Sequence, residues 1–309
     1  MLSRIAESLF WVGRYVERAD DTSRILDTHL QLLLEDPWIS EDLACRSLLA
    51  VMGAAPPPVG EQISPTHVMQ TLGYNRVNPG AIAGALDAAR ENARRARETI
   101  STELWECLNT TRNDLAHVIT SRTTPDFFAW VRERAAVATG ITDSATSRDQ
   151  IWTFIVLGRS IERADMTARL VATRAVAGSS GPSWTTLLRS CGAYEAFLRA
   201  YRGSASDALA AEFLLLDPLF PRSVVYALRQ AEQCLVDLGE GMERSSTENA
   251  VRILGRVRSG LEFRPVGQLL ENLPGEMEEV QRACSSASDA VRVRYFPTGV
   301  HDDWVGERV

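Results

Sequence analysis

The sequence predicts an all-α protein built from two diverged copies of one helical-bundle unit, related by a pseudo-twofold axis. Apolar residues recur at alternating steps of four and three, which is the period of an amphipathic helix. No stretch keeps the alternation of apolar and polar residues that is typical of a strand. Residues 13–24 also match residues 158–169 at eight of twelve positions, which indicates an internal duplication.

Each copy is predicted to open with a long helix. In the first copy the apolar seam runs from Ile5 to Leu33, which predicts a helix of about 30 residues. Ser3 is a suitable N-cap, and the helix should end at Asp36–Pro37 because the residue before a proline avoids the α region. In the second copy the same seam runs from Phe154 to Ala175.

The remaining elements follow in the same order in both copies. Further helices are predicted at about 39–53 and 79–109 in the first copy, and at about 183–202 and 221–240 in the second, with closing helices after them. Pro79 and Pro221 suit the first turn of a helix.

Loops and domain boundaries follow from the gaps in the helical pattern. Loops are predicted at 54–66, 139–147 and 178–182. The domain organisation is a first helical repeat at 1–140, a second at 147–295 and a flexible tail at 296–309, with the repeats packed as one compact unit.

The composition excludes several classes of protein. A net charge of -7 argues against general nucleic-acid binding, and five widely spaced cysteines argue against a disulfide framework or a zinc site. No apolar run is long enough to span a membrane, and Glu7 interrupts what would be a signal peptide, so a cytoplasmic location is expected. All 33 basic residues are arginines, whose planar guanidinium groups suit carboxylates and phosphates.

The charged residues of the duplicated segment form a stripe beside the apolar seam, rotated by about 100° around each helix. The residues at this angle are Glu17, Asp20 and Arg24 in the first copy, and Glu162, Asp165 and Arg169 in the second. Arg14 and Arg18, with their counterparts Arg159 and Arg163, lie a further step around the helix and are counted with the stripe. Gly158 allows a close backbone approach, so the two long helices can cross and bring the stripes together.

Two interpretations of this stripe stay open. In the structural one, Glu17 and Glu162 pair with arginines of the opposite or a neighbouring helix and fix the register between helices. In the functional one, the arginines line a cleft that binds a carboxylate or phosphate. The acids would then orient the arginines or bind an amine or a metal.

A second charged cluster lies at residues 89–98 and is predicted to continue on one helix to Asn109. Its candidate binding residues are Arg90, Glu91, Asn92, Arg94 and Trp105. A solvated, salt-bridged helix face explains the charges, whereas Asn92 and Trp105 suit a cleft. The second copy does not repeat this cluster, so any site here would be asymmetric.

Motifs for known chemistry are missing from the sequence. None of the four histidines follows a Glu-x-x spacing, and there is no nucleophile elbow, dinucleotide fingerprint or phosphate loop. We therefore predict no cofactor and no metal. A site for Mg²⁺ or Ca²⁺ made only of carboxylates stays an alternative, but the sequence contains no loop motif for one. No catalytic residue is assigned, and Glu17 and Glu162 are the candidates.

Four segments resemble the bacterial alpha-E superfamily, a helical family with a Glu-Arg motif. They are residues 2–4, 11–19, 89–94 and 104–106, and the resemblance covers nearly the whole chain. Its members are commonly encoded beside, or fused to, a circularly permuted ATP-grasp protein, often with a transglutaminase-like protease and sometimes with a proteasome-like peptidase. The resemblance implies a role in making or processing peptides or amides, and it transfers no catalytic residue.

Three functions are compatible with these observations. The first is a non-catalytic helical partner or substrate-binding component of an ATP-grasp-dependent peptide or amide ligase, binding the ligase, an acidic or peptide ligand, or both. The second is an enzyme that uses the Glu-Arg cleft for acid–base chemistry on a peptide or amide, which needs a carboxylate with a raised pKa. The third is a purely structural oligomerisation module. None of them involves nucleic acid or a membrane.

Overall fold

A computed structural model describes residues 1–35, 40–55, 57–58, 61–177, 182–202, 206–239 and 249–297 of the chain. Within these ranges the protein is all-helical, as predicted. The helices are α1 (Ser3–Glu35), α2 (Glu41–Val51), α3 (Pro65–Val68), the π-helix η1 (Met69–Gly73), α4 (Ile82–Arg95), α5 (Thr102–Ser121), α6 (Thr124–Ala145), α7 (Gln150–Ala177), α8 (Trp184–Ser190), α9 (Tyr194–Ala200), α10 (Asp207–Leu216), α11 (Val224–Asp237), α12 (Ala250–Glu262), α13 (Val266–Glu271) and α14 (Leu273–Tyr295).

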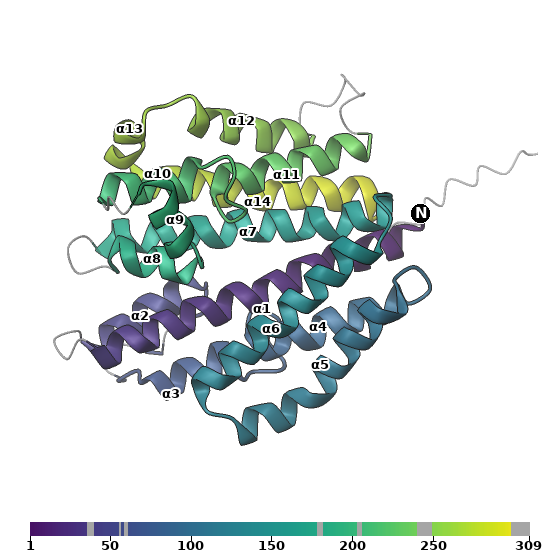
Figure 1. The fold of residues 1–309 in the computed structure, drawn as a ribbon, viewed down its shortest axis with the longest axis horizontal. Helices are drawn as coiled ribbons and strands as arrows, with labels where there is room; N and C mark the ends of the chain where they lie inside the picture. The colour runs from purple at the N-terminus through teal and green to yellow at the C-terminus, as the bar shows by residue number, and fades with distance from the viewer. Residues whose placement is uncertain are drawn as a thin grey trace, which may run out of the picture.

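The two long helices α1 and α7 lie side by side through the middle of the molecule (Figure 1). Helices α4 and α6 pack on α1, while α11 and α14 pack on α7. Helices α5 and α12 lie farther out, against α4 and α6 on one side and α11 and α14 on the other. The buried apolar side chains of both halves form one continuous core.

Two glycines allow α1 and α7 to touch through their backbones. A Cβ atom added to Gly158 would lie 2.0 Å from the carbonyl oxygen of Phe10, and one added to Gly13 would lie 2.0 Å from that of Ile155. Any larger residue would push the helices apart, since such an approach is far inside van der Waals contact. The close approach expected at Gly158 is therefore confirmed, and it recurs at Gly13.

Two predicted helices are each divided in two. The helix predicted at 183–202 breaks between α8 and α9, because Gly192 adopts a left-handed φ of 61°. The helix predicted at 79–109 ends at Arg95, and α5 begins only after Ser101, whose side chain accepts a hydrogen bond from the backbone N–H of Leu104.

Several predicted boundaries were also wrong. The loop predicted at 139–147 is helical as far as Ala145, because α6 continues through Gly140. Pro79 and Pro221 precede the N-caps of α4 and α11 rather than lying in their first turns. Ser3 is the first residue of α1 and not its cap.

The C-terminal end of the described chain belongs to the core. Phe296, predicted to begin the tail, is buried against the rings of Phe10 and Phe154, with centroid distances of 5.7 and 6.0 Å. The expected stop at Asp36–Pro37, the loop at 178–181 and the tail from 298 onward lie outside the described residues.

All five cysteines are buried free thiols, as expected for small core side chains. Burial raises the pKa of Cys191 to about 12, so this thiol is a poor nucleophile. Among the described helices, none is both long and apolar enough to cross a membrane.

Candidate functional site

Glu162 of α7 is held by two arginines of α1. It is 1% exposed. Arg18 binds it bidentately, with Nε 2.5 Å from Oε1 and Nη2 2.9 Å from Oε2. Arg14 donates from Nε to Oε2 at 2.6 Å. The crossing at Gly158, one turn before Glu162, brings these side chains into reach.

Glu17 of α1 is held in the reciprocal way. Arg163 of α7 binds it bidentately, at 2.7 Å to Oε1 and 2.8 Å to Oε2. Arg222, which precedes α11, lies 2.7 Å from Oε1. The stripes of α1 and α7 therefore face each other in a buried network, as the structural interpretation expected.

The arginines keep both glutamates ionised. Burial alone would raise the pKa of Glu162, but Arg14 and Arg18 outweigh it and lower the pKa to about 2, from an ordinary value of 4.5. The pKa of Glu17 is likewise about 2, because Arg163 and Arg222 outweigh burial. Neither glutamate has the raised pKa that acid–base chemistry near neutral pH requires.

The lowered pKa of Glu162 gives a test of the network by pH. A carboxylate whose pKa falls on folding stabilises the fold above its unfolded pKa, and this contribution disappears as the pH falls through the folded pKa. We expect the loss of stability in a Glu162→Gln variant to be large at neutral pH and to shrink between about pH 4.5 and pH 2. Urea unfolding of both proteins across this range measures it, and a difference that stays constant would contradict the assignment.

Arg222 was not among the residues predicted from the sequence. It pairs with Asp20, with Nη2 2.5 Å from Oδ2, and also with Asp21. Arg222 directly follows Pro221, and the equivalent position after Pro79 in the first copy is Gly80. The sequence shows this difference between the copies, but no neighbouring residue indicates that the side chain of Arg222 points toward α1.

The carboxylates of Glu17, Asp20 and Asp21 lie close enough for metal ligation, with oxygens within 4.8 Å of one another. Arg222 pairs with all three of them. Because its guanidinium already supplies positive charge at this position, the cluster suits an arginine rather than a metal ion. Burial raises the pKa of Asp21 well above its ordinary value, although Arg222 opposes this effect.

The other stripe residues form local pairs. Arg24 donates to Asp20 at 3.0 Å and Arg169 to Asp165 at 2.8 Å, each over one helical turn. Arg159 departs from the pattern of Arg14, because it pairs with Asp143 of α6 rather than with a glutamate of the opposite long helix.

The second predicted cluster is spread over two helices. Arg90 of α4 donates to Asn109 of α5 at 3.1 Å, and its guanidinium lies 5.1 Å from the ring centroid of Trp105. Asn92 donates to the backbone of its own helix. Arg94 and Glu91 form an exposed pair at 2.7 Å. Asn92 and Arg94 line a cavity of about 580 Å³ against α1, and the other three predicted residues are not part of its lining.

A second cavity, called here the inner cavity, has a volume of about 300 Å³ and lies between α1, α7 and α14. Its lining includes Phe10, Trp11, Arg14, Asp165, Arg169, Ser285, Ser288 and Phe296. Burial raises the pKa of Asp165 in this wall, although the neighbouring Arg169 opposes the rise. The stripe residues Arg14, Asp165 and Arg169 therefore line this cavity, and the lining residues of α14 were not predicted.

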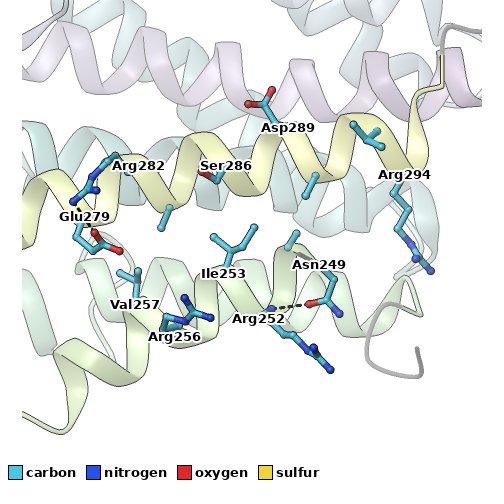
Figure 2. Close-up of a pocket in the computed structure, with 14 residues that line it drawn as sticks. Asn249, Arg252, Ile253, Arg256, Val257, Glu279, Arg282, Ser286, Asp289 and Arg294 are labelled. Carbon is cyan, nitrogen blue, oxygen red and sulfur yellow. Dashed lines mark hydrogen bonds and ion pairs between the residues drawn. The ribbon is translucent and has the colours of Figure 1, made fainter. Parts of the chain in front are cut away.

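The outer cavity, of about 1040 Å³, lies between α12 and α14 (Figure 2). Ile253 and Arg256 of α12 and Ser286 and Glu279 of α14 line it. Asp289 points away from α12 in Figure 2 and also lines the inner cavity, so the two spaces adjoin across α14. No residue of the duplicated stripe lines the outer cavity.

These features define a class of all-α protein in which buried, reciprocal Glu–Arg pairs join two long helices. The chain belongs to the Alpha-E family: the model of this family, described as a predicted alpha-helical domain with a conserved ER motif, matches residues 1–296. The resemblance seen in the sequence is confirmed.

The chain is also similar to uncharacterised proteins of Mycobacterium bovis and of two strains of Mycobacterium tuberculosis. Each is 24% identical over 311 residues, which cover 90% of this chain and 33% of the relative. The chain therefore spans about one third of the length of these curated relatives. No solved structure matches it.

Proposed function

We propose that the chain is a non-catalytic helical partner, or substrate-binding component, of a cytoplasmic system that forms peptides or amides with an ATP-grasp ligase. The observation that carries this proposal is the pairing of the Glu–Arg motif inside the fold. Glu17 and Glu162 are each bound by two arginines and stay ionised. Side chains held in this way maintain a structure and are poorly suited to moving protons.

The length of the relatives supports a role as a partner. In the mycobacterial proteins, the region similar to this chain is one third of a longer polypeptide. A domain that shares a polypeptide with other sequence is held near it at a high effective concentration.

We also infer that the two halves are diverged copies related by a pseudo-twofold axis. The reciprocal pairs of Glu17 and Glu162 support this inference. Arg18 donates to the carbonyl oxygen of Pro79 at 3.4 Å, and Arg163 donates to that of Pro221 at 3.5 Å. A twofold arrangement explains why equivalent arginines contact equivalent prolines in both halves.

Recovery of the chain from its native host tests the proposed partnership. We expect the tagged chain to co-purify with an ATP-grasp protein of the host, and mixing the two purified proteins should give one complex on size-exclusion chromatography. Mass spectrometry of the same eluate tests for a transglutaminase-like protease.

One control is needed to interpret the outcome. An unrelated tagged helical protein expressed at the same level reports non-specific recovery. Recovery of folded chain without the ATP-grasp protein, in cells that express both, would contradict the partnership. Recovery of the chain only with copies of itself would favour an oligomerisation module, and amide formation by the isolated chain would favour the enzyme.

A further inference from the structure

We propose that the inner cavity binds an extended peptide through one of its carboxylates, with Arg14 and Arg169 as the carboxylate-binding residues. This inference rests on the binding role proposed above and gives it a place and a ligand class. It is carried by the shape of the cavity, by the hydrogen bonds of its arginines and by an imbalance of charge around Glu162.

The residues that line the inner cavity are spread along α14. Its lining residues on α14 run from Gln281 to Arg292, which is about 16 Å along a helix that rises 1.5 Å per residue, and Phe296 lines it just beyond the helix. Only about 300 Å³ is spread over this length. An extended peptide fits such a space better than a compact ligand does, since residues of an extended chain advance by about 3.3 Å each.

The charges around the two glutamates differ. Near Glu17, the paired groups are three arginines and three carboxylates, which are Arg24, Arg163 and Arg222 with Glu17, Asp20 and Asp21. Near Glu162, three arginines face two carboxylates, which are Arg14, Arg18 and Arg169 with Glu162 and Asp165. The difference arises because Met166 stands where the first copy has Asp21. The second cluster therefore has one more arginine than carboxylates, whereas the lining of the inner cavity as a whole has three arginines and three acids.

Three contacts hold the guanidinium of Arg14 in place before any anion binds. Its Nε binds Glu162, and its Nη1 donates to the hydroxyl of Ser288 at 2.8 Å. Its guanidinium also lies 5.5 Å from the ring centroid of Trp11. The remaining Nη2 makes no hydrogen bond to the described residues. A donor fixed in this way loses little conformational entropy when a ligand binds.

Arg169 provides a second set of donors in the same wall. Its Nε donates a hydrogen bond to Asp165 at 2.8 Å. Its two terminal nitrogens make no hydrogen bond within the described part of the chain. Guanidinium groups bind carboxylates through paired, charge-assisted hydrogen bonds.

The acids that face the cavity set the direction of the peptide. Glu7 lies on α1 seven residues before Arg14, or about 10 Å along the helix. The other two acids of the lining are each paired with an arginine, Asp165 with Arg169 and Asp289 with Arg292. Glu7 disfavours a second carboxylate at its end of the cavity and suits an amino group. The peptide is therefore expected to place its carboxylate near Arg14 and its amino end toward Glu7.

Three probes of one length test the carboxylate. They are the pentapeptide Ala-Phe-Ala-Ala-Ala as the free acid, its C-terminal amide, and an amide form carrying one glutamate, each measured by calorimetry with the full chain. We expect the neutral amide to bind at least about tenfold more weakly than one of the acidic forms. The acidic form that binds identifies a terminal or a side-chain carboxylate. Equal binding of all three, or of none, would overturn the proposal.

Two neighbouring serines of α14 provide a matched pair of blocking variants. Ser285 is exposed and lines the inner cavity, whereas Ser286 is exposed and lines the outer one. Ser285→Tyr should abolish binding of the acidic probe and Ser286→Tyr should leave it unchanged. The opposite result would overturn the assignment, because it would place the peptide between α12 and α14.

A second matched pair tests the charge. Arg169→Gln should weaken binding about tenfold or more. Arg24→Gln removes the equivalent one-turn pair in the other half, away from the inner cavity, and should leave binding unchanged. Equal effects of the two variants would overturn the role of Arg169. Co-purification with the ATP-grasp protein is measured separately, so loss of peptide binding and loss of the partnership are distinguishable.

Discussion

Replacement of Glu162 by glutamine should lower the free energy of unfolding by about 3–5 kcal/mol, which is the usual cost of removing one partner from a buried ion pair. Arg14 and Arg18 would lose the only carboxylate with which they pair among the described residues. Glu17→Gln should cost less, because Arg222 would keep Asp20 and Asp21. Urea unfolding at neutral pH measures both values.

Glu279 provides a control for the loss of a charge as such. It forms an exposed pair with Arg282 at 2.7 Å on α14, and pairs of this kind contribute less than about 1 kcal/mol. Glu279→Gln should therefore unfold at nearly the same urea concentration as the unmodified protein. A Glu162→Gln variant as stable as Glu279→Gln would contradict a structural role for the motif.

Gly158→Ala should destabilise the fold by at least about 2 kcal/mol, because the added methyl group forces α1 and α7 apart. The new Cβ would lie 2.0 Å from the carbonyl oxygen of Phe10, and neither backbone can move alone. Separation of the helices would also stretch the contacts of Arg18 with Glu162, one turn away. Thermal and urea unfolding measure the change.

Gly140 offers the matched control, since it lies inside α6 with nothing within 4 Å of an added Cβ. Gly140→Ala should stabilise the fold by up to about 1 kcal/mol through helix propensity. Gly13→Ala should resemble Gly158→Ala, and the double variant should cost less than the sum, because one separation of the helices relieves both clashes. Full additivity would argue against a shared crossing.

The all-α class and the pairing of α1 with α7 were predictable because both depend on repeated spacing. Glu17 and Glu162 recur beside the apolar seam, and a charged stripe at that angle on both long helices needs a partner inside the protein. Gly158 indicated where the backbones could meet, whereas the equivalent contact at Gly13 was not predicted.

The divided helices were not predictable from the same period. Residues 96–101 keep a composition that suits a helix, and only the cap at Ser101 marks the new start. The break at Gly192 depends on one backbone conformation. The roles of Arg222 and Ser288 depend on how α11 and α14 pack against the long helices, and a long-range contact of this kind leaves no local signal.

The reciprocal pairs also constrain the order of events during synthesis. Arg18 and Glu162 are separated by 144 residues, and Arg163 and Glu17 by 146. At translation rates of about 5–20 residues per second, Arg18 leaves the ribosome on the order of 10 s before its counter-ion does. Until then the nascent N-terminal half has charged groups that it cannot bury. Each half supplies arginines that pair with a glutamate of the other half. A cut of the gene between α6 and α7 would therefore separate these paired side chains.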